Sequence, residues 1–385
     1  MAHDSSAPPA RRWRGGIPLL LVACLAGGCQ RAAEVQFVSA PEVEALDPPL
    51  RQAVQEQLAR HTGDLGAVKL VSDAALDSRH LQRGAAVYAR YCVQCHGASG
   101  DGAGPAAAYL VPRPRDYRKG IFKFNSTGYG NKPSRDDLLR TIRQGITGTS
   151  MPSFDRLPKE DLEAVVDYVL ALSQRGELET LLALQADSDG ELTPETADEL
   201  ALAVADQWRQ SRDNVVEPAT KEPAFDQASI ELGKEIFQKR ECFKCHGRDA
   251  RGGLAGGIEV GKDAWGQVAA AADLTSGMLH GGAEPLDVYR RIYAGINGTP
   301  MPAFKNLLAN EPDSVWHLTH YVLDLADQRR RGVQIPLGAA AGGATPPAPA
   351  ESGGATESPE PAPAESASPA SETPASETSS GEAAP

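Results

Sequence analysis

The sequence predicts a mainly α-helical chain built from two tandem copies of one domain. A Cys-x-x-Cys-His motif occurs at residues 92–96 and again at residues 242–246. A loop of the pattern Gly-Ile-x-Gly-Thr-x-Met-Pro-x-Phe follows each motif, at residues 145–154 and 295–304. Each methionine lies 55 residues after its histidine, and both features recur at an offset of 150 residues. In a chain of 385 residues, such a fixed offset indicates an internal duplication.

The Cys-x-x-Cys-His motifs predict covalent attachment of haem. Two cysteines three residues apart on one helical turn face the same way, so both sulfur atoms can bond to one haem. The adjoining imidazole then lies over the iron. We therefore expect two covalently bound haem c groups, held by six residues: Cys92, Cys95, His96, Cys242, Cys245 and His246.

The methionine loops predict the second axial ligand of each iron. Met151 and Met301 lie in Gly/Thr/Pro loops and not on periodic apolar stripes, and the proline after each keeps its backbone extended. The predicted iron ligands are His96, Met151, His246 and Met301. A rival for the second iron is the stretch 278–280, where a His280 ligand would lower the potential, but the repeated spacing favours Met301.

Two other uses of the cysteine pairs are less well supported by the pattern. A structural zinc site needs four protein ligands, and each motif offers two Cys and a His whose position beside the second Cys strains a tetrahedron. A redox-active dithiol in an oxidising compartment would explain neither the adjoining histidine nor the paired methionine. Haem attachment explains both.

The N-terminus predicts export and a lipid anchor. Residues 1–28 contain Arg11, Arg12 and Arg14 before an apolar run at residues 17–25, which is too short to span a bilayer and is typical of a signal peptide. The run ends in small residues before Cys29, a pattern that resembles a bacterial lipobox. We expect Cys29 to be acylated and the chain to be periplasmic or on the outer face of a bacterial membrane. An ordinary leader and an uncleaved anchor remain the alternatives.

Between the leader and the first haem domain, residues 29–79 predict a lipid-anchored tether. Pro48 and Pro49 precede apolar residues at near-helical spacing, which indicates one short helix in an otherwise extended segment. If this segment is flexible, its roughly fifty residues would reach about 40 Å from the membrane.

Each haem domain is expected to contain an N-terminal helix, a middle helix before the methionine loop and a C-terminal helix. Domain 1 is assigned to residues 80–175 and domain 2 to residues 224–333. Gly84 and Gly233 would allow the first and last helices to approach closely, with Tyr88 and Tyr168 at the crossing in domain 1. Four other histidines, His61, His80, His317 and His320, show no pairing that suggests a site.

Residues 176–223 are predicted to form a helical linker, and residues 334–385 a disordered tail. In the linker, Thr193 followed by Pro194 is a helix start signal. Acidic residues at 187–191 resemble a calcium loop only in part, because Gln185 and Thr196 stand where ligands are needed, so a solvated turn is favoured. The tail is rich in Ala, Pro, Ser and Glu, without a periodic apolar face.

With these motifs in hand, both domains resemble class I c-type cytochromes. Segments 112–118, 120–124 and 273–277 further resemble tandem dihaem cytochromes of environmental bacteria, which are thought to serve respiratory chains. The family implies a proline about ten residues after each histidine, whose carbonyl group orients the imidazole. Pro105 fits in domain 1. Domain 2 has no such proline, so its acceptor stays open, with the carbonyl groups of residues 251–253 as candidates and different potentials as a consequence.

Buried haem carboxylates need cationic or hydroxyl donors. In domain 1 the candidates are Arg115, Tyr117, Arg118 and Lys123. A solvated basic loop is an equally good interpretation of these residues.

Together these features predict a membrane-tethered electron carrier and not an enzyme. His/Met ligation fills both axial positions and leaves no site for a substrate. We expect electrons to come from a quinol-oxidising complex or dehydrogenase and to pass to a terminal oxidase. The alternatives are a cytochrome subunit of a larger oxidoreductase complex and a dihaem peroxidase. Nucleic acid is an improbable partner, because the formal net charge is −13.

Overall fold

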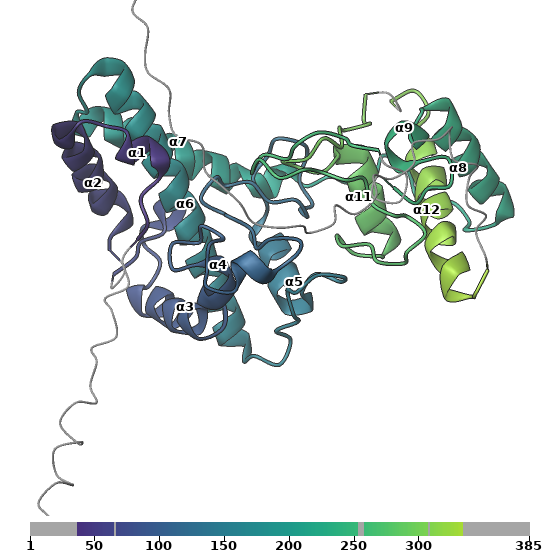
Figure 1. Cartoon of the computed structure of the whole chain (residues 1–385), viewed down its shortest axis with the longest axis horizontal. Helices are drawn as coiled ribbons and strands as arrows, with labels where there is room; N and C mark the ends of the chain where they lie inside the picture. Colours follow the sequence, from purple (N-terminus) through teal and green to yellow (C-terminus); the bar gives the residue numbers. More distant parts are fainter. Residues whose placement is uncertain (1–36, 65–66, 253–257, 307–308, 334–385) are drawn as a thin grey trace, which may run out of the picture. The chain divides into compact units, whose positions relative to one another are not determined.

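The computed structural model describes residues 37–64, 67–252, 258–306 and 309–333 (Figure 1). Helices form its regular structure, and no strand occurs within these ranges beyond two isolated bridges. The prediction of a mainly α-helical chain is therefore confirmed. Two hydrophobic cores divide the described residues into module 1 (residues 37–214) and module 2 (residues 215–333).

The predicted leader with Cys24 and Cys29, and the predicted tail at residues 334–385, lie outside the described residues. Within the described ranges, no helix combines the length and apolar character that crossing a bilayer requires.

Module 1 is built on the crossing of two helices, α3 (Ser78–Tyr91) and α6 (Lys159–Asp189). Gly84 lies at this crossing, where a Cβ atom would come within 2.1 Å of the Ala164 carbonyl oxygen. Tyr88 and Tyr168 pack there with ring centroids 5.3 Å apart. The glycine therefore sets the approach of the two helices, as expected. The haem motif follows as α4 (Val93–His96), and α5 (Arg135–Gln144) leads into the methionine loop.

Module 2 repeats this arrangement with α8 (Gln227–Lys239) and α12 (Ser314–Arg330). A Cβ atom on Gly233 would come within 2.0 Å of the His317 carbonyl oxygen. Phe237 and Tyr321 pack edge to face at 5.5 Å. The haem motif forms α9 (Phe243–His246), and α11 (Pro285–Ala294) precedes the second methionine loop. Both modules thus use the same helix crossing to hold a Cys-x-x-Cys-His turn.

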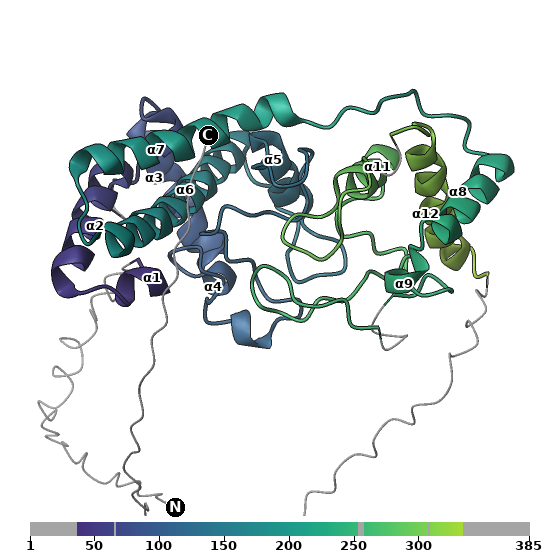
Figure 2. The ribbon, with the colours of Figure 1, turned by 90° about the horizontal axis from the view of Figure 1, so that it is seen from above.

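Helix α6 is longer than the sequence suggested, because it continues past residue 175 into the predicted linker and ends at Gly190. Its second half buries Leu178, Leu182 and Ala186, which extend the apolar stripe of the haem domain without a break. Helix α7 (Pro194–Arg209) then returns alongside α6 (Figure 2). The hydroxyl of Thr193 caps α7 by accepting from the Thr196 amide, as its position before Pro194 predicted.

The predicted short helix after Pro48 and Pro49 is present as α2 (Pro48–Thr62), but the segment around it is folded and not extended. Residues 41–73 form α1 (Pro41–Glu44), α2 and the 3₁₀ turn η1 (Val71–Asp73), which pack against α6 and α7. Val54 and Leu58 lie one turn apart on α2 and are almost completely buried in the core of module 1. The burial of each such side chain stabilises the folded state by about 1.5–3 kcal/mol. This segment therefore belongs to the folded module.

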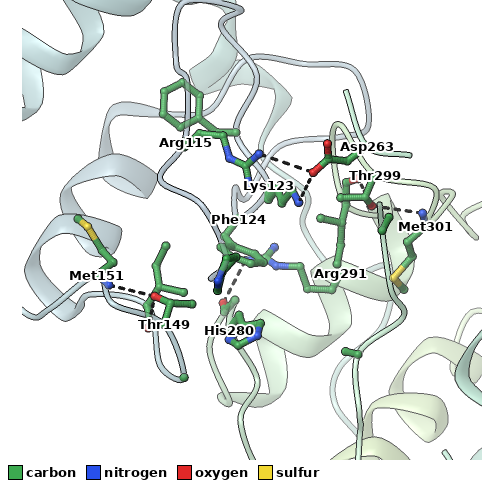
Figure 3. A pocket seen from close by; sticks show the side chains of 18 of the residues that line it. Arg115, Lys123, Phe124, Thr149, Met151, Asp263, His280, Arg291, Thr299 and Met301 are labelled. Atoms are coloured by element: carbon green, nitrogen blue, oxygen red, sulfur yellow. Dashed lines mark hydrogen bonds and ion pairs between the residues drawn. The ribbon is translucent and has the colours of Figure 1, made fainter. Parts of the chain in front are cut away.

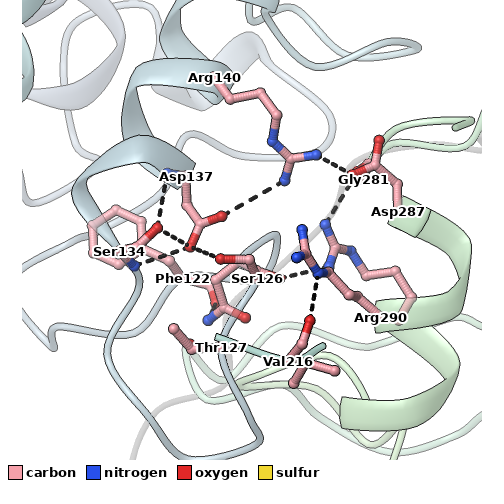
Figure 4. Close-up of polar contacts among 12 residues, drawn as sticks. Phe122, Ser126, Thr127, Ser134, Asp137, Arg140, Val216, Gly281, Asp287 and Arg290 are labelled. Carbon is pink, nitrogen blue, oxygen red and sulfur yellow. Dashed lines mark hydrogen bonds and ion pairs between the residues drawn. The ribbon is translucent and has the colours of Figure 1, made fainter. Parts of the chain in front are cut away.

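Polar contacts join the two modules around α5 and α11 (Figure 4). Arg140 of α5 forms an ion pair with Asp287 of α11. The Val216 amide of module 2 donates to the Ser126 carbonyl oxygen of module 1 at 2.8 Å, and the Val216 carbonyl oxygen accepts from Arg290 Nε at 3.0 Å. On the module 1 side, Asp137 caps α5 reciprocally with Ser134 and accepts from the Ser126 hydroxyl at 3.0 Å. The helices that precede both methionine loops therefore face each other across this junction.

Candidate haem sites

Both predicted haem-binding sets line one continuous cavity of about 1680 Å³. Its wall includes every predicted attachment and axial residue of both modules: Cys92, Cys95, His96, Met151, Cys242, Cys245, His246 and Met301. Much of the remaining wall is apolar, with Phe122, Ile142 and Phe154 from module 1 and Val288, Ile292 and Phe304 from module 2. Pockets for single small ligands are typically about 300–1000 Å³, so this volume suits two large apolar cofactors.

The His96 imidazole is oriented by a backbone carbonyl group. Its Nδ1 donates to the Arg115 carbonyl oxygen at 3.1 Å, which leaves Nε2 as the ring nitrogen with a free lone pair. Burial lowers the pKa of His96, so the ring is held in the neutral form that can bind a metal. The ring also packs against Tyr117, with centroids 4.9 Å apart. The prediction that the Pro105 carbonyl group orients His96 is therefore wrong. The acceptor comes from a later loop, at Arg115.

His246 has an equivalent partner in module 2. Its Nδ1 donates to the Ala272 carbonyl oxygen, also at 3.1 Å, and burial lowers its pKa in the same way. The acceptor is therefore Ala272 and not Arg251 or Gly252, while Gly253 lies outside the described residues. An aspartate follows the acceptor in both modules, as Asp116 and Asp273. The two histidines consequently have matched hydrogen bonds. A missing acceptor in domain 2 is therefore no longer a reason to expect different haem potentials.

The buried cysteines have the properties of attachment residues and not of reactive thiols. Burial, followed by the charge of Cys95, raises the pKa of Cys92 to about 12. Burial likewise raises the pKa of Cys242 to about 11. Reactive dithiols have lowered thiol pKa values in exposed, electropositive surroundings. Cys92 and Cys242 show the opposite, which argues against a redox dithiol.

The two methionine loops, loop 1 (residues 145–154) and loop 2 (residues 295–304), have nearly the same backbone (Figure 3). The Met151 amide donates to the Thr149 hydroxyl at 3.1 Å, and the Met301 amide donates to the Thr299 hydroxyl at 3.2 Å. Both threonine hydroxyls in turn donate to an isoleucine carbonyl oxygen at 2.8 Å. Gly145 opens loop 1 with φ near 70°, where a Cβ atom would collide with Pro152. This shared geometry places both methionines on the cavity wall.

The rival ligand His280 has a different setting from Met301. Its Nδ1 donates to the Thr147 carbonyl oxygen of loop 1, at 2.5 Å. Met278 also lies beside loop 1, and its side chain is half exposed. Residues 278–280 therefore contact the methionine loop of the other module.

A charged cluster crosses between the modules within the cavity wall (Figure 3). Asp263 of module 2 accepts from Lys123 at 3.0 Å and lies 3.8 Å from the Arg115 guanidinium group. That guanidinium group also stacks on Trp265, 3.6 Å from the ring centroid, and the Trp265 indole donates to the Asp116 carbonyl oxygen at 2.8 Å. Burial lowers the pKa of Arg115 to about 10, partly offset by the charge of Asp263.

Arg291 on α11 is a second buried cation on the cavity wall, only 9% exposed. Its two terminal nitrogens donate to the carbonyl oxygens of Asn125, at 2.6 Å, and Gly281, at 3.1 Å. Its Nε has no hydrogen-bond partner among the described residues. Burial lowers the pKa of Arg291 to about 10. A buried cation with a spare donor is suited to a carboxylate ligand.

The four predicted carboxylate-binding residues of domain 1 separate into two groups. Arg115, Tyr117 and Lys123 all line the cavity, although Arg115 and Lys123 already share Asp263. Arg118 instead forms an ion pair with Asp116 at 2.9 Å. Asp263, Trp265 and Arg291 were not predicted from the sequence. Trp265 could have been singled out as an aromatic residue in a Gly- and Ala-rich loop, but its contact with Arg115 forms only in the folded chain.

The remaining histidines have structural partners. His80 lies 2.8 Å from Asp167 within module 1. His317 and the fully buried His320 both contact the Ser229 hydroxyl at the crossing of α8 and α12. Across the described ranges, no three His, Cys, Asp or Glu side chains gather as a metal ion would require. Asp187 and Asp189 of the weak calcium pattern lie in the last turn of α6.

The residues present therefore fit haem. Each module offers a pair of free thiols on one turn, an imidazole fixed through Nδ1, and a thioether, all on the cavity wall. Cationic side chains for carboxylates lie on that wall as well.

Comparisons with known proteins agree with this geometry. Residues 79–169 match the family described as cytochrome C oxidase, cbb3-type, subunit III, and residues 230–326 match the family described as cytochrome c. The chain is also similar to a chain of the reducing HAO-like protein complex Kustc0457/Kustc0458 of Kuenenia stuttgartiensis, with 31% identity and a TM-score of 0.50. That match covers 63% of this chain and 96% of the other. No match was found among curated proteins.

Two cytochrome c matches thus fall one on each module, over the two helix crossings and the two Cys-x-x-Cys-His motifs. Cytochrome c domains bind haem c and transfer electrons. The chain belongs to the tandem dihaem c-type cytochromes.

Proposed function

We propose that this protein is a membrane-tethered respiratory electron carrier in which one chain holds two haems of similar ligation. The haem iron, when bound, supplies reversible one-electron chemistry. Cys92 and Cys95 attach one group and Cys242 and Cys245 the other. His96 with Met151 would hold the first haem iron, and His246 with Met301 would hold the second. Soft thioether ligation favours the ferrous state and hence a positive potential.

One observation carries this proposal: the two ligand sets line a single cavity. Electrons entering through one module can therefore leave through the other without a second protein. The Nδ1 hydrogen bonds of His96 and His246 keep Nε2 of both rings free to bind a metal. Arg291 supports the proposal because its unpaired Nε could donate a hydrogen bond to a haem carboxylate.

The physiological partners belong to the same proposal. We place the chain between a quinol-oxidising complex or dehydrogenase, as donor, and a terminal oxidase, as acceptor. Residues 79–169 match a family described as a subunit of cytochrome c oxidase, and this match supports a respiratory setting.

A second candidate is a cytochrome subunit bound permanently in a larger oxidoreductase complex. The similar chain from the HAO-like protein complex favours this reading, since it is itself part of an assembly. Co-purification with a stable partner from native membranes would distinguish this candidate from a free carrier.

The carrier function is tested by electron exchange. Reduced protein mixed with an oxidised monohaem cytochrome c should react with a second-order rate constant of about 10⁵–10⁷ M⁻¹s⁻¹, the range of ordinary protein encounters. Stopped-flow absorbance of both partners measures this rate. Both haems should be oxidised in the same kinetic process if they exchange electrons rapidly within the cavity. Oxidation of only one haem on this time scale would contradict the proposal.

The membrane anchor is tested at Cys29. Metabolic labelling with a palmitate analogue should mark the wild-type protein, because lipoprotein processing acylates the cysteine that follows the leader. The Cys29→Ser variant should be unlabelled and appear in the soluble fraction if the leader is removed. Cys24→Ser, within the leader, is the matched control and should behave as the wild type. A wild-type protein that is membrane-bound but unlabelled would show an uncleaved anchor instead.

A further inference from the structure

We propose that each module secures the methionine loop of the other, so that the sixth ligand of one haem depends on residues of the opposite module. This inference rests on the proposed ligation by Met151 and Met301. It adds three positioning residues, His280 and Met278 for loop 1 and Asn297 for loop 2. His280 and Met278 lie outside both haem-binding motifs, and Asn297 lies in loop 2, where the two motifs differ (Thr147 in loop 1).

Loop 1 is held by residues 278–280 of module 2. The His280 Nδ1 donates to the Thr147 carbonyl oxygen, four residues before Met151. At the next residue, Gly148, a Cβ atom would lie 3.0 Å from the His280 ring and 3.1 Å from the Met278 sulfur. Gly148 has φ near +77°, so this turn both requires glycine and fits closely against module 2.

Loop 2 is held by module 1 through the opposite kind of contact, in which the loop supplies the side chain. Asn297 is 6% exposed, and its Oδ1 accepts from the Gly130 amide at 2.8 Å. Its Nδ2 donates to the Asn131 carbonyl oxygen at 3.2 Å. Both ends of this buried amide are therefore satisfied by module 1, and a buried amide without partners is unfavourable.

Inside its own module each loop has mainly local hydrogen bonds. Loop 1 closes through Ile146, which donates to Met151, and loop 2 closes through the equivalent Ile296 and Met301. Glycine-rich turns with few long-range contacts are among the least stable parts of a fold. Loop 1 therefore depends on the cross-module contacts, whereas loop 2 combines them with a bond in its own module, from the Ala264 amide to the Gly298 carbonyl oxygen at 2.9 Å.

His280 is the better position for a test, because its side chain is exposed and its truncation leaves both cores intact. The experiment uses the full haem-loaded chain in a Met301→Ala background, where only the Met151 sulfur-to-iron band remains in the near infrared. Adding His280→Ala should weaken that band, lower the remaining His/Met potential and speed carbon monoxide binding by up to about tenfold, the effect of losing one hydrogen bond. His280→Asn, which keeps an amide donor near the Nδ1 position, should restore the behaviour of the background.

Two further variants check the direction of the effect. Asn297→Ala in a Met151→Ala background should weaken the Met301 band in the same way. His80→Ala, which removes an imidazole bonded to Asp167 within module 1, is the matched control and should change neither band. Far-ultraviolet circular dichroism should be the same for all variants, since no helix is altered.

The possible outcomes separate this inference from the proposed ligation. If Met151→Ala and Met301→Ala each remove a band but His280→Ala leaves the Met151 band and potential unchanged, the reciprocal contact is wrong and the ligation stands. If neither methionine variant removes a band, the ligation itself is wrong. Loss of the band in both His280→Ala and His280→Asn would show that His280 acts other than through its hydrogen bond, and would also contradict the inference.

Discussion

Replacing Met301 by alanine is expected to remove one of two weak sulfur-to-iron bands in the near infrared and to lower one midpoint potential by on the order of 0.1 V, within the roughly 0.8 V over which axial ligands move haem potentials. The reason is that a soft thioether stabilises ferrous iron, and alanine offers no replacement donor. Loop 2 otherwise keeps its geometry, because the Met301 amide and carbonyl groups, not the side chain, form its hydrogen bonds.

Met151→Ala should have the same effect on the other haem, since the two loops share their internal bonds to within 0.1 Å. Met278→Leu tests the rival ligand, because Met278 is the only other methionine in the described residues; it contacts loop 1 and not loop 2, so this variant should keep the Met301 band. Disappearance of a band in Met278→Leu, with both bands kept in Met301→Ala, would overturn the assignment. Redox titration followed by near-infrared absorbance measures all three variants.

The sequence predicted the parts of this molecule that depend on local pattern. The repeated Cys-x-x-Cys-His turns, the methionine loops and the glycines at Gly84 and Gly233 follow from spacing and residue type alone. The structure places Gly84 and Gly233 at equivalent helix crossings and brings His96 and Met151 to one cavity wall. Thr193 likewise caps a helix as its position before proline predicted.

Other features depended on tertiary contacts that no local pattern encodes. Residues 41–73 are polar enough on average to suggest a tether, yet Val54 and Leu58 lie on one face and are buried under α6. Helix α6 runs past residue 175 because no proline interrupts it before Gly190, and its internal Gly176 packs closely against Arg118. The imidazole acceptors were misplaced for a similar reason, since Arg115 and Ala272 come from loops 19 and 26 residues after their histidines.

The contacts between modules were the least predictable part. Asp263 and Lys123 are 140 residues apart in sequence, and His280 and Thr147 are 133 residues apart. Each is an ordinary polar residue in a loop, and its role appears only when the two copies of the domain meet. Duplication predicts two equivalent haem sites but says nothing about how one copy contacts the other.

Carrier and peroxidase differ in whether one iron has an accessible sixth position. A peroxidase needs such a position with an acid or base nearby to assist O–O cleavage. His280 is the nearest candidate base, beside loop 1, but its Nδ1 is bonded to Thr147 and Met151 stands on the cavity wall. We therefore expect that His280 does not act as the acid or base of a peroxidase reaction.

Carbon monoxide binding to the fully reduced wild-type protein tests this claim most directly, with peroxide turnover measured on the same sample. If both irons carry histidine and methionine, carbon monoxide should bind slowly and incompletely at both haems, and peroxide should be consumed no faster than by a monohaem carrier. Rapid carbon monoxide binding at one haem, together with peroxide turnover at about 1–10³ s⁻¹ as in typical enzymes, would contradict the account and identify the chain as a peroxidase.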